Sequence, residues 1–272
     1  MTAGFDDHHI ALLLPALSSI SARAEMLPLA SRLAPHWHCV IPDWPGFGDA
    51  PRTRRRALGP DTLRDFLDSL IQSNVGGPAL GIAAGHAAPY LVEAALRHPG
   101  LFARLVLIAP TWRGPLPTMF GPSRQGLALR ARKAFDLPVL GPLLYRAATS
   151  RRMLEKMMRA HVYVDAAVVT PELLAAKLHV VRQPDARFGT AAFISGGLDP
   201  VASRAGFLAL FADGLPPTLL LRPSQAPSRS AAEMDALAAT GRVVCVTIPG
   251  ALAAHEEHPD AVAQAIGAFL TQ

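Results

Sequence analysis

Three side chains in this sequence could move protons, and each stands next to an apolar run or a glycine-rich turn. His86 comes two residues after the aliphatic stretch 79–84. Asp199 lies in a Gly-Gly-Leu-Asp-Pro segment, and His255 precedes two glutamates. Imidazole and carboxylate groups are common general acids and bases in enzymes. The structural alternatives are sideways packing for His86, loop or helix capping for Asp199, and capping or a surface position for His255.

Trp112 and Arg113 are the pair best suited to hold a ligand. An indole can stack on a planar molecule, and a guanidinium can bind a carboxylate or a phosphate. Alternatively, the tryptophan belongs to the core and the arginine ties two parts of the chain together. Other polar groups that follow predicted strands are also candidate ligand-binding residues, namely Ser18, Asp43, Arg222 and Ser224.

Six apolar runs predict the strands that would position these groups: 10–14, 38–42, 79–84, 104–109, 218–221 and 243–248. Segments with helical spacing, such as 62–72 and 259–270, lie between and after them. Nearly continuous apolar strands that alternate with helices are typical of a parallel sheet covered on both faces. We therefore expect an α/β fold, a three-layer sandwich with a mostly parallel sheet of about six strands. Ligands of such sheets bind beyond the carboxyl ends of the strands.

Residues 113–190 interrupt this alternation. Apolar residues recur there at helical intervals, so we expect a helical cap inserted into a core domain of residues 1–112 and 191–272. The insertion carries 13 Lys and Arg against 5 Asp and Glu, whereas the rest of the chain is mildly acidic. This charge favours an anionic ligand or partner near the insertion, unless it is simply the solvated surface of Arg-rich helices.

Four segments resemble the α/β-hydrolase superfamily, in the order and spacing of that family. They are the strand and turn 40–48, the turn Gly85-His86-Ala87-Ala88, the strand 105–110 and the loop 248–259. The resemblance covers nearly the whole chain and implies the fold of the family. It also implies where a Ser-His-Asp triad would stand, with the nucleophile on a sharp turn from strand to helix.

The positions that correspond to this triad hold residues that cannot do its chemistry. The nucleophile position is Ala87, or Ala83 in an alternative register. The acid position is Ala226 and the histidine position is Leu252. The pair that usually shapes the oxyanion hole reads Pro15-Ala16, and proline has no backbone donor. Because acyl transfer needs these groups together, the resemblance implies a member without serine-hydrolase activity.

Two functional hypotheses follow. In the first, the protein is non-hydrolytic and binds a small, hydrophobic or anionic molecule at the carboxyl edge of the sheet, under the cap. In the second, it is an enzyme of another reaction type, such as a lyase, a cyclase or a cofactor-free oxygenase, that uses His86, His255 or Asp199 for proton transfer. An esterase whose register is misassigned is a third alternative.

Composition and motifs argue against several other classes of protein. No apolar run reaches the ~18–20 residues of a membrane span, and the N-terminal residues lack the pattern of a signal peptide. No zinc, RNP or helix-turn-helix pattern points to nucleic acid. We expect Cys39 and Cys245 to be buried free thiols in a cytoplasmic protein. We expect no metal and no cofactor, and the sequence leaves a homodimer open.

Overall fold

The computed structural model describes residues 9–52, 58–120, 132–135 and 137–272. Its centre is a six-stranded sheet in the order β2-β1-β3-β4-β5-β6, in which every neighbouring pair is parallel. The strands are β1 (His9–Leu14), β2 (Trp37–Val40), β3 (Ala79–Ala84), β4 (Phe102–Ile108), β5 (Thr218–Pro223) and β6 (Val244–Ile248). Because all six run in one direction, the loops after them meet at one edge of the sheet.

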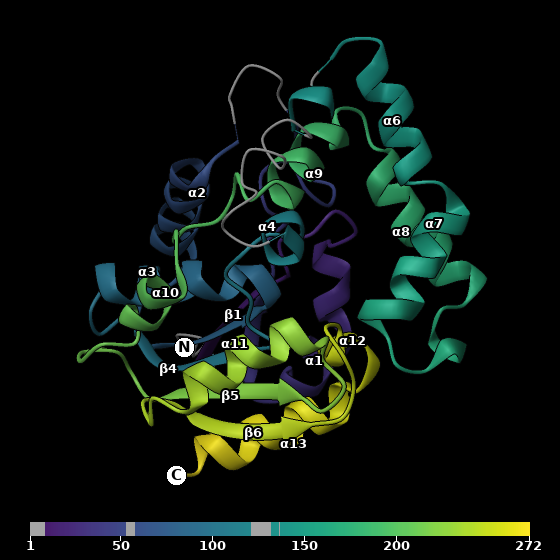
Figure 1. The fold of residues 1–272 in the computed structure, drawn as a ribbon. Coiled ribbons are helices and arrows are strands. Elements are labelled where there is room, and N and C mark those ends of the chain that lie inside the picture. Colours follow the sequence, from purple (N-terminus) through teal and green to yellow (C-terminus); the bar gives the residue numbers. More distant parts are fainter. Residues whose placement is uncertain (1–8, 53–57, 121–131, 136) are drawn as a thin grey trace, which may run out of the picture.

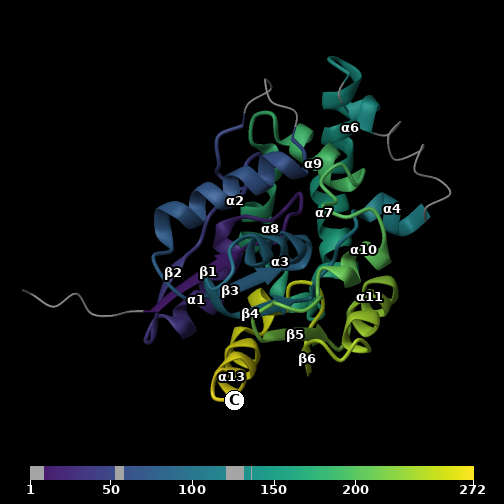
Figure 2. The ribbon, with the colours of Figure 1, turned by 90° about the vertical axis from the view of Figure 1, so that its left-hand side faces the viewer.

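Helices cover both faces of this sheet (Figures 1 and 2). The core of one face includes residues of α1 (Leu27–Leu33), α12 (Ala254–Glu257) and α13 (Pro259–Leu270). The core of the other includes residues of α2 (Pro60–Asn74), α3 (Ala88–Arg97), α10 (Arg204–Ala209) and α11 (Ser228–Ala238). Along β1, Leu13 belongs to the first core, and Leu12 and Leu14 belong to the second, as the two-residue period of a strand requires. The predicted three-layer α/β sandwich is confirmed.

A helical segment lies between β4 and β5, and we call residues 113–194 the inserted segment. Its described part contains α4 (Pro115–Phe120), α6 (Leu140–Ala148), α7 (Arg151–Met157), η4 (Met158–Val162), η5 (Ala166–Val168), α8 (Pro171–Arg182) and α9 (Ala186–Ile194). Tyr145 and Leu178 belong to a small core of its own, which also includes Ile20 and Ala253 from loops at the sheet edge. The N–H of Ala253 donates to the carbonyl of Val162 at 3.1 Å. The division into a core domain and a separate cap stays a prediction.

Three details differ from the sequence predictions. Helix α11 is not predicted, because it buries only Met234 and Leu237 and so leaves a weak apolar pattern. Strand β2 ends at Val40 rather than at residue 42, which is a proline and cannot donate to a ladder. Both cysteines are free, but Cys39 is only half-buried and Cys245 is exposed, because each lies on an edge strand of the sheet. Among the described helices, none is long and apolar enough to cross a membrane.

Candidate functional site

The sharp turn after β3 is made by Gly85. Its φ of +51° lies in the left-handed region, and η2 (Gly85–Ala87) leads directly into α3. A Cβ atom on this residue would lie 3.2 Å from the Cβ of Ala16, so the loop after β1 packs closely against the turn. The resemblance implies a nucleophile position at Ala87 or Ala83, but Ala83 lies inside β3 and Ala87 lies at the end of η2. The turn falls between these registers, on a residue without a side chain.

Beside this turn, a carboxylate of the chain itself occupies the backbone donor of Ala16. The N–H of Ala16 donates to Oε1 of Glu25 at 2.6 Å. Glu25 lies in η1 (Arg23–Met26) and is 4% exposed. The neighbouring carbonyl of Pro15 accepts a hydrogen bond from Nε1 of Trp44 at 2.8 Å. While Glu25 holds the Ala16 N–H, this donor cannot stabilise an oxyanion.

His86, which follows the turn directly, meets Asp199, which is far from it in the chain. Nε2 of His86 lies 3.2 Å from Oδ1 of Asp199 and 3.2 Å from the carbonyl of Leu198. The same Asp199 oxygen accepts the N–H of Gly114 at 2.8 Å, which ties the loop after β4 to this pair. The His86 ring is 2% exposed and packs edge-on against Phe193. The structure therefore holds an imidazole oriented by a carboxylate, the arrangement of a general base.

Trp112 and Arg113 follow β4 and directly precede Gly114, whose N–H holds Asp199. Nε1 of Trp112 donates to Glu233 at 3.0 Å, and its ring stacks on Phe207. The Arg113 guanidinium carbon lies 4.9 Å from the centre of the Trp112 ring, within the range of a cation–π contact. Burial acts to raise the pKa of Glu233, but hydrogen bonds from Arg204 and Trp112 and the charge of Arg113 lower it. Trp112 thus belongs to the core, whereas the Arg113 guanidinium still has an N–H group that can donate a hydrogen bond.

A second polar group joins the inserted segment to the sheet edge, and we call it the buried ion cluster: Glu25, Tyr163, Lys177, His255 and Glu256. Nζ of Lys177 lies 3.0 Å from Oε2 of Glu256 and 4.0 Å from Oε2 of Glu25. The hydroxyl of Tyr163 donates to the same oxygen of Glu256 at 2.7 Å. Nε2 of His255 lies 3.5 Å from Oε1 of Glu25, close enough for an ion pair but without hydrogen-bond alignment. The cluster therefore links α8 to the loops after β1 and β6.

Neighbouring charges keep Glu25 ionised although it is buried. Burial acts to raise the pKa of Glu25, but the contact with His255, the charge of Lys177 and the Ala16 N–H outweigh it and lower the pKa. Burial, and then the charge of Glu256, raise the pKa of the Tyr163 phenol, so that this residue stays a hydrogen-bond donor. The cluster therefore contains a buried carboxylate that stays ionised and a phenol that stays protonated.

Of the residues in the buried ion cluster, only His255 is a candidate site residue in the sequence. One signal in the sequence could have indicated the cluster. Lys177 lies on the buried side of α8, between Leu174 and Leu178, where an apolar residue is expected. A lysine in such a place needs an acidic partner, but the chain gives no indication of which acid that is.

Two of the candidate ligand-binding residues make hydrogen bonds within the loops after β1 and β2. The Asp43 carboxylate accepts the N–H groups of Arg23, at 2.7 Å, and of Asp49, at 3.1 Å. The Ser18 hydroxyl lies 2.7 Å from that of Ser21. These contacts fix the two loops, and a role of either residue in ligand binding stays a prediction.

Four more residues singled out from the sequence lie after β5 and β6 or at their ends. Arg222 makes two hydrogen bonds to the carboxylate of Asp235 in α11, at 2.5 and 3.1 Å, and Ser224 is exposed. Ala226 lies in the turn that follows β5, and Leu252 lies between β6 and α12. The roles assigned to all four stay predictions. Neither Ala226 nor Leu252 has a group that could transfer a proton.

Four buried side-chain nitrogen atoms have no hydrogen-bond partner among the residues that the structure describes. They are Nδ1 of His86, Nε of Arg113 and both ring nitrogens of His255. These residues follow three different strands, β3, β4 and β6, at one edge of the sheet. An unsatisfied buried polar group costs about 1–3 kcal/mol, so each of these atoms favours a polar ligand or an ordered water nearby. In the described part of the chain, no group of three or more His, Cys, Asp or Glu could hold a metal ion.

Comparisons with known proteins place this geometry among related folds. A sequence model described as "Alpha/beta hydrolase family" matches residues 11–265. A thermophilic esterase from Thermogutta terrifontis superimposes with a TM-score of 0.72 at 18% identity, over 97% of this chain and 89% of that one. The enol-lactonase from Burkholderia xenovorans gives 0.73 at 16%, over 98% and 94%. MenH from S. aureus gives 0.69 at 13%, over 100% and 96%. A search of curated proteins finds no match.

Proposed function

This chain belongs to the alpha/beta hydrolase family, and we propose that it binds a small molecule at the carboxyl edge of its sheet without forming an acyl-enzyme. Covalent hydrolysis in this family requires a nucleophile on the turn after the central strand. The turn here is formed by Gly85, and glycine has neither a hydroxyl nor a thiol. The Ala16 N–H beside it is already engaged by Glu25. Both features support a non-hydrolytic role.

The observation that carries this proposal is that buried nitrogen atoms of His86, Arg113 and His255, which follow three strands at one edge of the sheet, have no hydrogen-bond partner in the described part of the chain. Arg113 is a permanent cation, and the imidazoles can donate or accept a hydrogen bond. A ligand with one carboxylate or phosphate and an apolar body suits this set, because the surrounding residues are core aliphatics and aromatics such as Leu198 and Phe193. The ligand class we propose is therefore a small hydrophobic anion.

Access to this site requires movement. His86 and His255 are 2% and 1% exposed, so a ligand reaches them only when the inserted segment or the adjoining loops shift. Binding that waits for such a change is slower than the ~10⁵–10⁷ M⁻¹s⁻¹ usual for a preformed site. We propose that the inserted segment acts as the cap of the site.

A direct test uses titration calorimetry with 1-naphthoate as the probe. Arg113→Ala should weaken its binding roughly 10- to 150-fold, the value of one hydrogen bond to a charged group. Arg182→Ala is the matched control, because Arg182 is exposed and belongs to the inserted segment. Unchanged affinity in Arg113→Ala would remove this residue from the site. Absence of saturable binding to the wild-type protein would refute the proposed ligand class, and labelling by a fluorophosphonate would refute the non-hydrolytic role.

The His86–Asp199 pair favours a second candidate, an enzyme that transfers protons without a nucleophile. Asp199 and the Leu198 carbonyl both face Nε2, which makes Nδ1 the free, proton-accepting nitrogen. Lyases, cyclases and cofactor-free oxygenases can use such a base. If turnover of any such substrate is found, His86→Gln should abolish it. Full turnover in a variant that carries His86→Ala, His255→Ala and Asp199→Ala together would end this alternative.

A further inference from the structure

Helix α6 carries an apolar stripe on its outward face. Leu140, Leu143 and Leu144 are 48%, 60% and 39% exposed, and with Ala147 they follow the i, i+3, i+4, i+7 spacing of one helix face. The buried residues of α6 are Gly141 and Tyr145, on another side. An amphipathic helix normally turns such a stripe toward the core. In α6 the stripe faces solvent.

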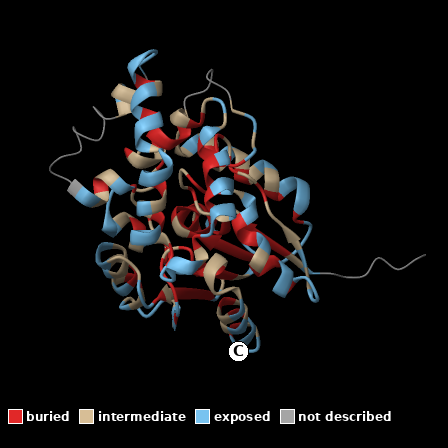
Figure 3. Cartoon of the chain, turned by 90° about the vertical axis from the view of Figure 1, so that its right-hand side faces the viewer, coloured by how far each residue is buried: buried red, intermediate tan, exposed pale blue. Residues whose placement is uncertain are grey.

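The chain on either side extends this apolar surface. Leu137 and Val139 precede α6 with 47% and 76% exposure, and Met153 in α7 is 51% exposed. Six of the eleven large hydrophobic residues that are exposed in the described part of the chain thus fall between positions 137 and 153. Figures 1 and 2 show α6 at the extremity of the molecule farthest from the sheet, and Figure 3 shows the exposed side of the inserted segment. Such a concentration of exposed apolar residues marks an interaction surface.

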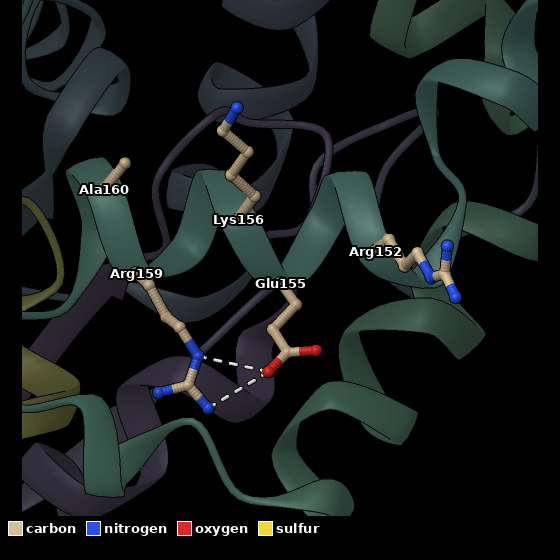
Figure 4. A pocket seen from close by; sticks show the side chains of 5 residues that line it. All are labelled: Arg152, Glu155, Lys156, Arg159 and Ala160. Carbon is tan, nitrogen blue, oxygen red and sulfur yellow. Dashed lines mark hydrogen bonds and ion pairs between the residues drawn. The ribbon is translucent and has the colours of Figure 1, made fainter.

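Helices α6 and α7 also carry unpaired cations. Arg146, Arg151, Arg152 and Lys156 are exposed and form no ion pair with any residue that the structure describes. Glu155 is the single acid between positions 137 and 164, and Arg159 neutralises it at 3.1 Å. Figure 4 shows Arg152 and Lys156 extending away from this pair. The five residues that it labels line an open hollow of about 460 Å³. The net charge beside the stripe is therefore positive.

We propose that α6 and α7 dock the protein on a membrane surface that contains anionic lipid, with the leucine stripe in the interface and the cations on phosphate head groups. Helices that lie in such an interface combine a leucine-rich face with Lys and Arg beside it. Anionic lipid is the partner that can contact both the apolar stripe and the cations. This role goes beyond ligand binding at the sheet edge and does not depend on it.

Charge argues against a second copy of the chain as the occupant. A two-fold dimer places the same patch of each subunit on its partner. The patch of one subunit that carries Arg146, Arg151 and Arg152 would then face the same basic patch of the other, and like charges that face each other across an interface destabilise it. Nucleic acid would suit the cations but would leave the apolar stripe exposed.

Co-sedimentation with lipid vesicles tests this proposal. The full-length protein should pellet with vesicles of phosphatidylcholine mixed with phosphatidylglycerol, and much less with phosphatidylcholine alone. Rising salt should release it, because head-group attraction is screened. Arg151→Glu/Arg152→Glu should lower the vesicle partition coefficient roughly 30-fold or more, since each basic residue near the surface contributes about a factor of 5. Leu143→Asp/Leu144→Asp should lower it at least as much.

Matched controls separate this surface from general effects of charge. Leu96→Asp alters a leucine that is 36% exposed on α3, outside the inserted segment, and should leave vesicle binding unchanged. Circular dichroism and sedimentation velocity on each variant check fold and molar mass. Equal pelleting with both vesicle types, or binding that survives both double variants, would overturn the proposal. It would also be overturned if wild type is a dimer that Leu143→Asp/Leu144→Asp converts to monomer, because the stripe is then an interface between copies.

Discussion

Lys177 is the cation between two buried carboxylates, and its removal gives a test of the ion cluster that needs no ligand. The side chains of Lys177, Glu25 and Glu256 are only 7%, 5% and 14% exposed. Lys177→Met keeps most of the volume but leaves Glu256 with Tyr163, and Glu25 with His255 and the Ala16 N–H. Breaking a buried ion pair by removing one partner costs about 3–5 kcal/mol. At about 2–4 °C per kcal/mol for a chain of this size, we expect Tm to fall by roughly 10 °C.

The assay is thermal and urea unfolding of purified variants at neutral pH, followed by circular dichroism. Arg159→Met is the matched control, because it breaks the Glu155 pair, in which both side chains are 38% exposed, together with hydrogen bonds to the carbonyls of Ala166 and Val169. An exposed pair of this kind contributes about 0.2–1 kcal/mol. The double variant Lys177→Met/Glu256→Gln should recover part of the loss, because one of the two unpaired charges is gone. A loss in Lys177→Met no larger than in Arg159→Met would refute the argument that this cluster attaches the inserted segment to the core.

Three further changes have expected outcomes. Because the pKa of Glu25 is lowered in the folded state, its ionisation stabilises the fold above the ordinary carboxyl pKa of 4.5. That stability is lost as pH falls below 4.5, so urea unfolding at a series of pH values should show a smaller loss of unfolding free energy in acid for Glu25→Gln than for the wild type. Gly85→Ser should cost about 1–2 kcal/mol, because it puts a side chain at a φ of +51° and close to Ala16, and activity-based labelling should stay negative. Gly267→Ala in α13, where an added Cβ meets nothing within 4 Å, should raise stability by about 0.5–1 kcal/mol in thermal unfolding.

Apolar periodicity is sufficient to predict the sheet, because the strands are buried on both faces. β3 is buried along its whole length, and its predicted bounds agree with Ala79–Ala84. The same signal fails for α11, where Ser, Ala and Arg cover most of the surface and two residues carry the burial. It also fails for the burial of Cys39 and Cys245. Burial of a strand depends on its place in the sheet, and the chain order does not show that β2 and β6 are the edges.

The site is harder to predict from the sequence than the sheet is, because its contacts join residues that are far apart in the chain. His86 and Asp199 are separate candidates in the sequence, and the fold brings them to 3.2 Å. The position of the turn depends on the backbone angle of Gly85, and a motif that normally carries serine gives no register when serine is absent. The Glu25–Lys177 contact joins a loop of the core to the inserted segment, and residue spacing does not predict it.

The polar groups at the sheet edge differ in how completely they are satisfied, and this difference separates their roles. Glu25, Lys177, Glu256 and Tyr163 all have charged or hydrogen-bonded partners, so structural attachment explains them. Three other nitrogen atoms, Nδ1 of His86, Nε of Arg113 and Nδ1 of His255, have none, and Nε2 of His255 has only its unaligned contact with Glu25 at 3.5 Å. At about 1–3 kcal/mol each, their combined cost would be comparable with the ~5–15 kcal/mol that stabilises a whole domain. A purely structural role for that set would therefore be selected against. Substitution of His86 by Phe should accordingly raise stability while it lowers naphthoate affinity, whereas a fall in both would assign His86 to the core.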